Sequence, residues 1–161
     1  MIDKVRPSDA KDIACIYNHY VKTSVATFDT EEWSEEKMRK RIEELSSNFP
    51  YIVYRLPDGK IAGYCYAHPW KEKDAYSHTL ETTVYVSKEH TGKGIGRILM
   101  DELIKDCKEK GFKTLIACIT QGNESSFKLH EKLGFEKVSH FKKVGIKFNQ
   151  WLDVIDYELM L

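Results

Sequence analysis

A glycine-rich turn between a strand-like segment and a helical one most constrains this chain. The segment Tyr85–Ser87 leads into the run Thr91–Arg97, and a helical pattern extends from about Gly94 to Lys110. Glycine adopts positive φ without strain, and a helix N-terminus directs unpaired N–H groups and the positive end of its dipole at one point. Although such turns also simply join strands to helices, this one predicts an anion-binding loop with glycines at positive φ and two cations beside them (Gly92, Gly94, Gly96; Lys93, Arg97).

The surroundings of the turn exclude two common nucleotide-binding folds. No Gly-Lys-Ser/Thr sequence closes it, as a mononucleotide P-loop requires. It also lies deep in the chain without the preceding βαβ unit of a dinucleotide-binding fold. The helical pattern after the turn leads into a strand over Thr114–Ile119 and a second helix that opens at Gly122–Ser126 and stops at Leu133–Phe135.

These segments together resemble the coenzyme A site of the GNAT N-acetyltransferases. The family pattern is Arg/Gln-x-x-Gly-x-Gly/Ala followed by Asn-x-x-Ala/Ser, and Thr91 stands here where Arg or Gln is usual. That departure removes one side-chain donor and leaves the backbone amides unchanged. The resemblance implies acetyl-CoA as cosubstrate, bound by Gly92, Lys93, Gly94, Ile95, Gly96, Arg97, Asn123 and Ser126.

Segments along nearly the whole chain are similar to the phosphinothricin acetyltransferase branch of that family. They include Asn18–Tyr20, Ala67–Lys71, Glu81–Ser87, Leu129–Phe135, Gly145–Lys147 and Trp151–Val154. The resemblance implies acetyl transfer to the primary amine of a small amino acid or analogue such as phosphinothricin or methionine sulfoximine. Direct transfer in a ternary complex is expected, rather than an acetyl-cysteine intermediate, because the cysteines fit packing positions. The resemblance also implies a homodimer, to which the aromatic-rich segment 148–151 would contribute apolar contact.

The composition is that of a small globular protein, with 161 residues, 42% hydrophobic and 31% charged, and a formal net charge of +0. We expect one domain over residues 1–161, no nucleic acid or membrane as partner, no metal and a cytoplasmic location, because there is no membrane-length apolar run and no signal peptide. Without any Cys-x-x-Cys spacing, the cysteines are expected to be small buried packing residues (Cys15, Cys65, Cys107 and Cys118).

Periodicity and turn signals predict an α+β fold, and the resemblance implies its GNAT form, a mixed, mostly antiparallel twisted sheet flanked by helices. Ser8-Asp9 can cap a helix that runs past Val21, and Ser34 can cap a second helix that ends near Leu45. A hairpin turn is expected at Pro57-Asp58-Gly59. The strands are expected over 1–6, 51–55, 60–68, 77–86, 114–119, 136–144 and 151–161.

One acidic side chain lies in the middle of the strand that precedes the glycine-rich turn. Side chains alternate along a strand, so Glu81, Thr83 and Tyr85 share one face. A buried carboxylate is costly unless it is paired or its pKa shifts, so Glu81 belongs either to a structural ion pair or to a reactive site. The resemblance favours Glu81 as the general base that removes a proton from the substrate ammonium.

A histidine on the second helix is the other candidate catalytic residue. Asn123, Ser126 and His130 are spaced three and four apart, so they share one helix face. A lone helical histidine is usually a packing or surface residue. Many GNAT enzymes carry at this position a tyrosine that protonates the leaving thiolate, whereas the phosphinothricin branch carries histidine. The resemblance implies that His130 assists the acid–base chemistry or hydrogen-bonds a catalytic group.

The resemblance also implies how the substrates are held. Backbone N–H groups at Val84, Tyr85 and Val86 would bind the pantetheine and polarise the thioester carbonyl. The acceptor would be bound by Phe28, Lys71, Lys73, Tyr76 and Thr83, with Trp151 closing the pocket. Lys73 stands where related enzymes commonly carry arginine, which would form a planar fork. Without the resemblance, the lysines fit a solvated loop equally well, and the aromatic residues fit a core.

Two other functions remain open from the sequence. A silent acyl-CoA-binding regulatory domain would have the same turn but no use for Glu81 and His130. A protein N-terminal acetyltransferase would need an open groove, which the pocket-closing segments disfavour. Turnover of acetyl-CoA with amino acids, amines and peptides would separate the three functions.

Overall fold

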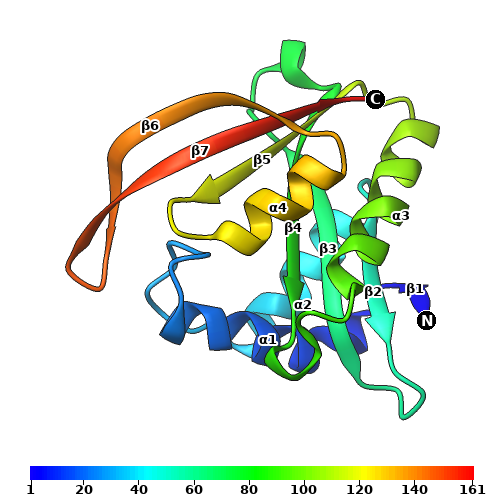
Figure 1. The fold of residues 1–161 in the computed structure, drawn as a ribbon. Helices are drawn as coiled ribbons and strands as arrows, with labels where there is room; N and C mark the ends of the chain where they lie inside the picture. Colours follow the sequence, from blue (N-terminus) through cyan, green and yellow to red (C-terminus); the bar gives the residue numbers. More distant parts are fainter.

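The computed structural model describes residues 1–161 and shows a seven-stranded sheet with helices on both faces (Figure 1). The sheet order is β1-β2-β3-β4-β5-β7-β6. Only β4 and β5 run parallel, and the other neighbouring pairs are antiparallel, which confirms the expected mixed, mostly antiparallel sheet. The strands are β1 (Ile2–Lys4), β2 (Tyr51–Arg55), β3 (Ile61–Pro69), β4 (Thr79–Val86), β5 (Thr114–Thr120), β6 (Glu136–Lys147) and β7 (Gln150–Met160).

The helices cover the sheet through two separate hydrophobic clusters. Tyr64 and Cys65 are neighbours on β3 and point to opposite faces, because side chains alternate along a strand. Tyr64 packs in the cluster of α1 and α2, and Cys65 packs in the cluster of α3. The helices are α1 (Ala10–Thr23), α2 (Glu35–Ser46), α3 (Ile95–Glu109) and α4 (Glu124–Lys132), with short 3-10 turns η1 (Pro7–Asp9), η2 (Asp74–Tyr76) and η3 (Lys88–His90).

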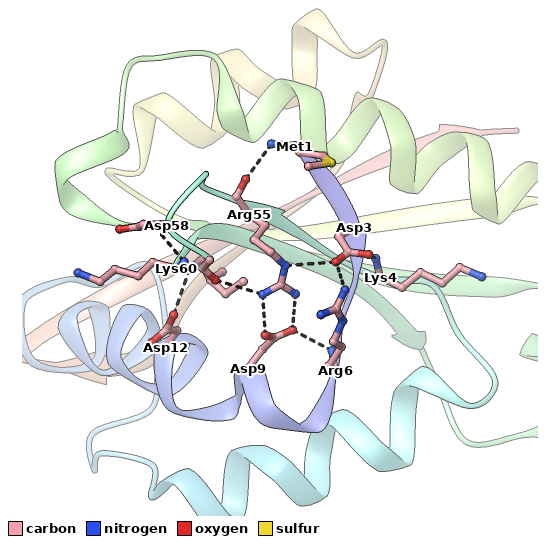
Figure 2. A network of polar contacts seen from close by, with 11 residues as sticks. Met1, Asp3, Lys4, Arg6, Asp9, Asp12, Arg55, Asp58 and Lys60 are labelled. Atoms are coloured by element: carbon pink, nitrogen blue, oxygen red, sulfur yellow. Dashed lines mark hydrogen bonds and ion pairs between the residues drawn. The ribbon is translucent and has the colours of Figure 1, made fainter.

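The two predicted helix caps have different outcomes. Ser34 caps α2 as expected, because its Oγ accepts a hydrogen bond from Lys37 N at 3.1 Å. Asp9 precedes α1, but its side chain makes no cap bond to that helix, so this prediction is wrong. Its carboxylate instead accepts two hydrogen bonds from Arg55, each of 3.0 Å, across 46 residues of sequence (Figure 2).

The contacts of Asp9 belong to a larger group of charges around the N-terminus, the N-terminal charge network of Asp3, Arg6, Asp9 and Arg55 (Figure 2). Arg55 also donates to Asp3 at 3.2 Å, and Arg6 donates to the same carboxylate at 2.8 Å. The network therefore connects β1, η1 and the end of β2 through charge-assisted hydrogen bonds.

The sheet opens where β4 and β5 diverge (Figure 1). The parallel pairing covers three residue pairs and ends at Glu81 and Ile116. Beyond that point β5 pairs with β7 on its other side, through Thr120, while β4 continues beside β3 to Val86. The separation exposes one edge of β4 between residues 82 and 86.

A long hairpin of β6 and β7 projects beyond the helices (Figure 1). It carries large apolar side chains that are exposed, namely Val138, Phe141, Val144, Ile146, Phe148 and Trp151. None of the helices combines the length and the apolar character that crossing a membrane would require.

The cysteines separate into two pairs. Cys65 and Cys107 are buried, as expected, and Cys65 Sγ donates to the carbonyl of Leu99 at 3.3 Å. Cys15 and Cys118 are exposed, so the expectation of four buried cysteines is wrong for these two. Cys118 is exposed because β5 has left β4 at this position and a cavity lies in front of it.

Candidate active site

A cavity of about 790 Å³ lies where β4 and β5 diverge. Its walls come from α1, the segment after α1, β3, β4, the glycine-rich turn, β5 and α4. This one cavity is lined by many of the predicted site residues, which come from separate parts of the chain. They are Glu81, Thr83, Val84, Tyr85, Val86, Gly92, Asn123, Ser126 and His130.

The glycine-rich turn has the backbone geometry that an anion requires. Gly92 has φ +75° and Gly94 has φ +80°, and a Cβ at either position would meet no atom within 4 Å. Gly94 is the N-cap residue of α3 and has no side chain, so no capping side chain occupies the first N–H groups of the helix. Both observations fit the pyrophosphate of a coenzyme A molecule approaching this helix N-terminus.

The third glycine of the turn differs from the other two. Gly96 lies inside α3 at ordinary φ, so the prediction of positive φ is wrong there. A Cβ at Gly96 would lie 3.6 Å from Leu129 and 3.7 Å from Val86, which is ordinary van der Waals contact, so neither the backbone nor the space requires glycine at this position. Ile95 is buried, and Lys93 and Arg97 are exposed and lie outside the cavity lining.

The exposed edge of β4 directs two backbone N–H groups into the gap. Ser87 N donates to the carbonyl of Ala62 on the β3 side, so odd-numbered residues of β4 turn their N–H groups to β3. The backbone N–H groups of Val84 and Val86 therefore point to the opposite edge of β4, which has no strand partner because β5 has diverged. The predicted amide contribution of Tyr85 is wrong, because its N–H faces β3, and Tyr85 reaches the cavity with its side chain.

Glu81 lies at the last paired position of β4, and no Lys or Arg forms an ion pair with it. Its nearest ion-pair partner is His68 on β3, with 3.9 Å between Glu81 Oε1 and His68 Nε2. Burial lowers the pKa of His68, so this histidine is neutral near pH 7. Burial, and then the nearby carboxylate of Asp156, raise the pKa of Glu81, while a hydrogen bond from Cys118 lowers it. The structural ion-pair interpretation of Glu81 is therefore disfavoured.

His130 lies on the cavity wall with Asn123 and Ser126, as their spacing predicted. The His130 residue is 4% exposed, and its Nδ1 lies 2.8 Å from the carbonyl oxygen of Ser126. A carbonyl only accepts, so Nδ1 carries the proton and Nε2 carries a lone pair. Burial lowers the pKa of His130, which favours this neutral form. Asn123 caps α4 by accepting from Ser126 N at 3.4 Å.

Most of the predicted acceptor-binding residues lie away from the cavity lining. Lys71 places its ammonium 4.2 Å from the Trp70 ring centroid and 5.3 Å from that of Tyr76. Lys73 is exposed just before η2. Phe28 packs on Gly145 of β6, where a Cβ would collide with its ring. Trp151 is exposed on the hairpin, and of the predicted acceptor residues only Thr83 lines the cavity.

The segment after α1 is held against the cavity by contacts that no sequence pattern indicated. Lys147 of β6 is 4% exposed, and its Nζ donates to the carbonyls of Ser24 and Thr27 at 2.7 and 2.8 Å. Tyr17 of α1 hydrogen-bonds Thr27 at 2.8 Å. The Lys147 bonds join residues more than a hundred positions apart, so neither periodicity nor spacing could reveal them. His68 and Cys118 also line the cavity, and sequence reasoning missed both for the site.

Comparisons with known proteins agree with this geometry. The sequence matches the acetyltransferase (GNAT) domain family over residues 2–155. The chain belongs to the GNAT acetyltransferase family. A phosphinothricin N-acetyltransferase of Streptomyces viridochromogenes is 38% identical over 94% of this chain and 84% of its own. An L-methionine sulfoximine/L-methionine sulfone acetyltransferase of Salmonella typhimurium is 33% identical over 98% of this chain and 94% of its own.

Solved structures of GNAT proteins superimpose on the whole chain. A phosphinothricin acetyltransferase from Sinorhizobium meliloti in complex with acetyl-CoA has a TM-score of 0.97 at 34% identity, covering 100% of this chain and 88% of its own. A ribosomal-protein-alanine N-acetyltransferase from Brucella melitensis has a TM-score of 0.97 at 32% identity, covering 100% and 99%. These likenesses confirm the GNAT fold.

Proposed function

We propose that this GNAT enzyme transfers the acetyl group of acetyl-CoA to the primary amine of a small amino acid or analogue, with phosphinothricin and methionine sulfoximine as the leading candidates. One observation carries the proposal. A carboxylate with a raised pKa, two inward backbone N–H groups and the start of a turn whose glycines have positive φ and open space in front of them border the same cavity. Acetyl transfer to an ammonium needs all three, because the amine must lose a proton, the thioester carbonyl must be polarised and the cosubstrate must be held.

The proposed reaction begins with the acceptor bound as an ammonium beside Glu81. Glu81 removes one proton, and the neutral amine then attacks the thioester carbonyl carbon while Val84 and Val86 donate to its oxygen. The C–N bond forms, the C–S bond breaks and the electron pair leaves with the thiolate. The second proton of the nitrogen ends on sulfur, so one proton is released overall.

Direct transfer is supported by the chemistry of the cavity cysteine. Cys118 is the thiol that lines the cavity, and burial, together with the Glu81 and Asp156 carboxylates, raises its pKa. A thiol, rather than a thiolate, is a poor nucleophile near pH 7. An acetyl-cysteine intermediate is therefore disfavoured, and the proposal uses a ternary complex.

His130 is proposed to orient the thioester end of the cosubstrate. Its Nδ1 proton is engaged by the Ser126 carbonyl, which leaves Nε2 as an acceptor. A neutral histidine in this tautomer does not protonate a leaving thiolate from Nε2. It can instead accept a hydrogen bond from an amide of the pantetheine arm or from the product thiol.

We further propose a homodimer, built on the β6–β7 hairpin, in the cytoplasm, where acetyl-CoA is available. Six large apolar side chains are exposed between residues 138 and 151 of the hairpin, which is more than scattered surface residues explain. Light scattering is expected to give twice the 18.8 kDa chain mass at micromolar concentration. Replacing Phe141 and Trp151 with Ser should shift the distribution toward monomer, and a monomer at all concentrations of the unmodified protein would contradict the proposal.

An acceptor panel tests the proposed function directly. The purified protein is given acetyl-CoA with phosphinothricin, methionine sulfoximine, ordinary amino acids, simple amines and short peptides, and free thiol is measured. The proposal predicts the highest kcat/KM for the amino acid analogues. Preferred acetylation of peptides would favour the activity named for the Brucella neighbour, and acetyl-CoA binding without thiol release would indicate a regulatory domain.

A further inference from the structure

A histidine faces the proposed base from the neighbouring strand. His68 on β3 and Glu81 on β4 are directly opposite in the antiparallel register, so their side chains share a face of the sheet. Both line the cavity, and their side chains are 21% and 28% exposed. His68 Nε2 lies 3.9 Å from Glu81 Oε1. His68 is therefore the titratable side chain of β3 that lies directly opposite Glu81.

The hydrogen bonding of His68 fixes which nitrogen faces the carboxylate as an acceptor. His68 Nδ1 lies 3.0 Å from the carbonyl oxygen of Pro69. A carbonyl cannot donate, so the proton of the neutral ring is on Nδ1 and the lone pair is on Nε2. The basic nitrogen of His68 thus points at the group that the proposed reaction protonates.

The charged and titratable groups that act on this pair come from α2, β3, β5 and β7. Arg41 of α2 acts on His68, and the Tyr66 ring centroid on β3 lies 5.9 Å from that of His68. Cys118 of β5 and Asp156 of β7 act on the far side of Glu81. Burial and Arg41 lower the pKa of His68, while the Pro69 carbonyl opposes them. The pKa of Glu81 is raised and that of His68 is lowered, so the two pKa values are closer together than those of an ordinary glutamate and histidine.

We propose that His68 receives the substrate proton from Glu81 and passes it to solvent, an inference that rests on the proposed function of Glu81. The O–H bond of the Glu81 carboxyl breaks and an N–H bond forms at His68 Nε2, which restores the carboxylate. The transfer requires a rotation of the Glu81 side chain that closes the 3.9 Å between the two atoms to hydrogen-bond distance, while His68 Nδ1 keeps its contact with the Pro69 carbonyl. The imidazolium then loses the proton to solvent. His68 acts through Glu81 and is a positioning and relay residue, not a group that touches the substrate.

The need for such a relay follows from the proton balance of the reaction. Each turnover releases one proton, and Glu81 must be a carboxylate again before the next ammonium can be deprotonated. A base whose pKa is raised by burial gives its proton directly to water less readily than an ordinary glutamate. The His68 imidazole, which is 21% exposed beside a carboxylate that is 28% exposed, gives the proton a second route to solvent when a bound substrate covers Glu81.

The test compares His68→Gln with His78→Gln, an exposed histidine outside the cavity lining. With saturating acetyl-CoA and acceptor at pH 7, His68→Gln should lower kcat about tenfold and leave both KM values within about twofold. His78→Gln should behave as the unmodified enzyme. The unfolding midpoint is recorded for each variant. Unchanged kcat in His68→Gln, or a change in acceptor KM alone, would overturn the relay.

Chemical rescue and a double variant separate a relay from a packing role. In His68→Ala, added imidazole should restore kcat in proportion to its free-base concentration, whereas wild-type kcat should not respond. In a Glu81→Gln background, His68→Gln should cause no further loss. Failure of rescue, or a further loss in that background, would contradict the relay while leaving the proposed function intact. Wild-type activity in Glu81→Gln would instead overturn the base assignment itself, and the relay with it.

Discussion

Charged side chains are paired with opposite charges in the N-terminal charge network, whereas the carboxylates near the floor of the cavity are not. In the network, Arg55 meets Asp9 and Asp3 at hydrogen-bond distance, so each charge faces its opposite (Figure 2). The cavity floor is formed by His68, Glu81 and Cys118. Asp156 does not line the cavity but acts on Glu81 and Cys118, and no Lys or Arg forms an ion pair with either carboxylate.

The difference shows what each region can do. Hydrogen bonds to Asp9 raise the pKa of Arg55, so its charge is fixed at every physiological pH. Burial and Asp156 raise the pKa of Glu81, which brings protonated and ionised forms closer in free energy. Asp156 Oδ1 is buried without a hydrogen-bond partner. The ion pairs of the N-terminal charge network stabilise the fold. The carboxylates near the cavity have no Lys or Arg partner, which costs stability but lets Glu81 accept and release a proton.

The largest expected effect is on catalysis at Glu81. Glu81→Gln keeps the size and polarity of the side chain but removes the base, so kcat at pH 7 should fall by about 10²- to 10⁴-fold. The affinity for acetyl-CoA, measured by calorimetry, should be unchanged. Much of the loss should be recovered at higher pH, where more of the acceptor amine is already neutral. Full activity of this variant at pH 7 would contradict the role of Glu81 as the base and would indicate that the cavity floor has only a structural role.

The next effect concerns stability in the paired region. Asp9→Asn leaves the largely buried Arg55 without its bidentate partner, so the free energy of unfolding should fall by about 2–4 kcal/mol. Turnover per folded molecule should match the unmodified enzyme, because the network does not line the cavity. Urea denaturation and initial rates on one preparation check both. A loss of kcat with unchanged stability would remove the contrast between the two regions.

A smaller effect is expected in the glycine-rich turn. Gly94→Val places a side chain in the open space before α3 and should weaken acetyl-CoA binding about tenfold or more in calorimetry. Gly59→Val is the matched control, because Gly59 has φ +89° and open space in front of it but lies in the β2–β3 turn. Both variants should lose about 1–2 kcal/mol of stability from the left-handed backbone. Equal acetyl-CoA affinity in the two variants would contradict an anion site.

The smallest effect is expected from the lysines outside the cavity. Replacing Lys71 and Lys73 together with Ala should raise KM for an anionic acceptor a few-fold, because exposed charges are screened by salt. KM for acetyl-CoA and for a neutral aliphatic amine should not change. If every acceptor behaves as with the unmodified enzyme, the two lysines belong to a solvated loop.

Local features of the fold could be predicted from the sequence, and long-range pairings could not. The cap at Ser34, the positive φ of Gly92 and Gly94 and the shared face of Asn123, Ser126 and His130 depend on neighbours within a few residues, so spacing determines them. Spacing assigns Asp9 to the helix beside it, whereas its true partner, Arg55, is 46 residues away.

The candidate site shows the same division. The position of Glu81 on a strand face and of the turn before α3 could be predicted, and the cavity brings Glu81 and the start of that turn together. His68 and Cys118 border the cavity because of register between strands, which one sequence does not specify. The position of Lys71 shortly before β4 predicts that its side chain binds the acceptor. In the structure its ammonium lies over the Trp70 ring, and Lys71 does not line the cavity.

The most direct test measures stability and turnover together in Glu81→Gln as a function of pH. The folded-state pKa of Glu81 is raised above its ordinary value of 4.5, so the wild type loses stability as pH rises through that raised value and keeps it below 4.5. Glutamine does not titrate, so the variant should be more stable than the wild type at pH 7, with the advantage disappearing toward pH 4, while its kcat at pH 7 is reduced. A variant that is destabilised at pH 7, as Asp9→Asn is expected to be, and that retains wild-type kcat would show that Glu81 is a structural carboxylate.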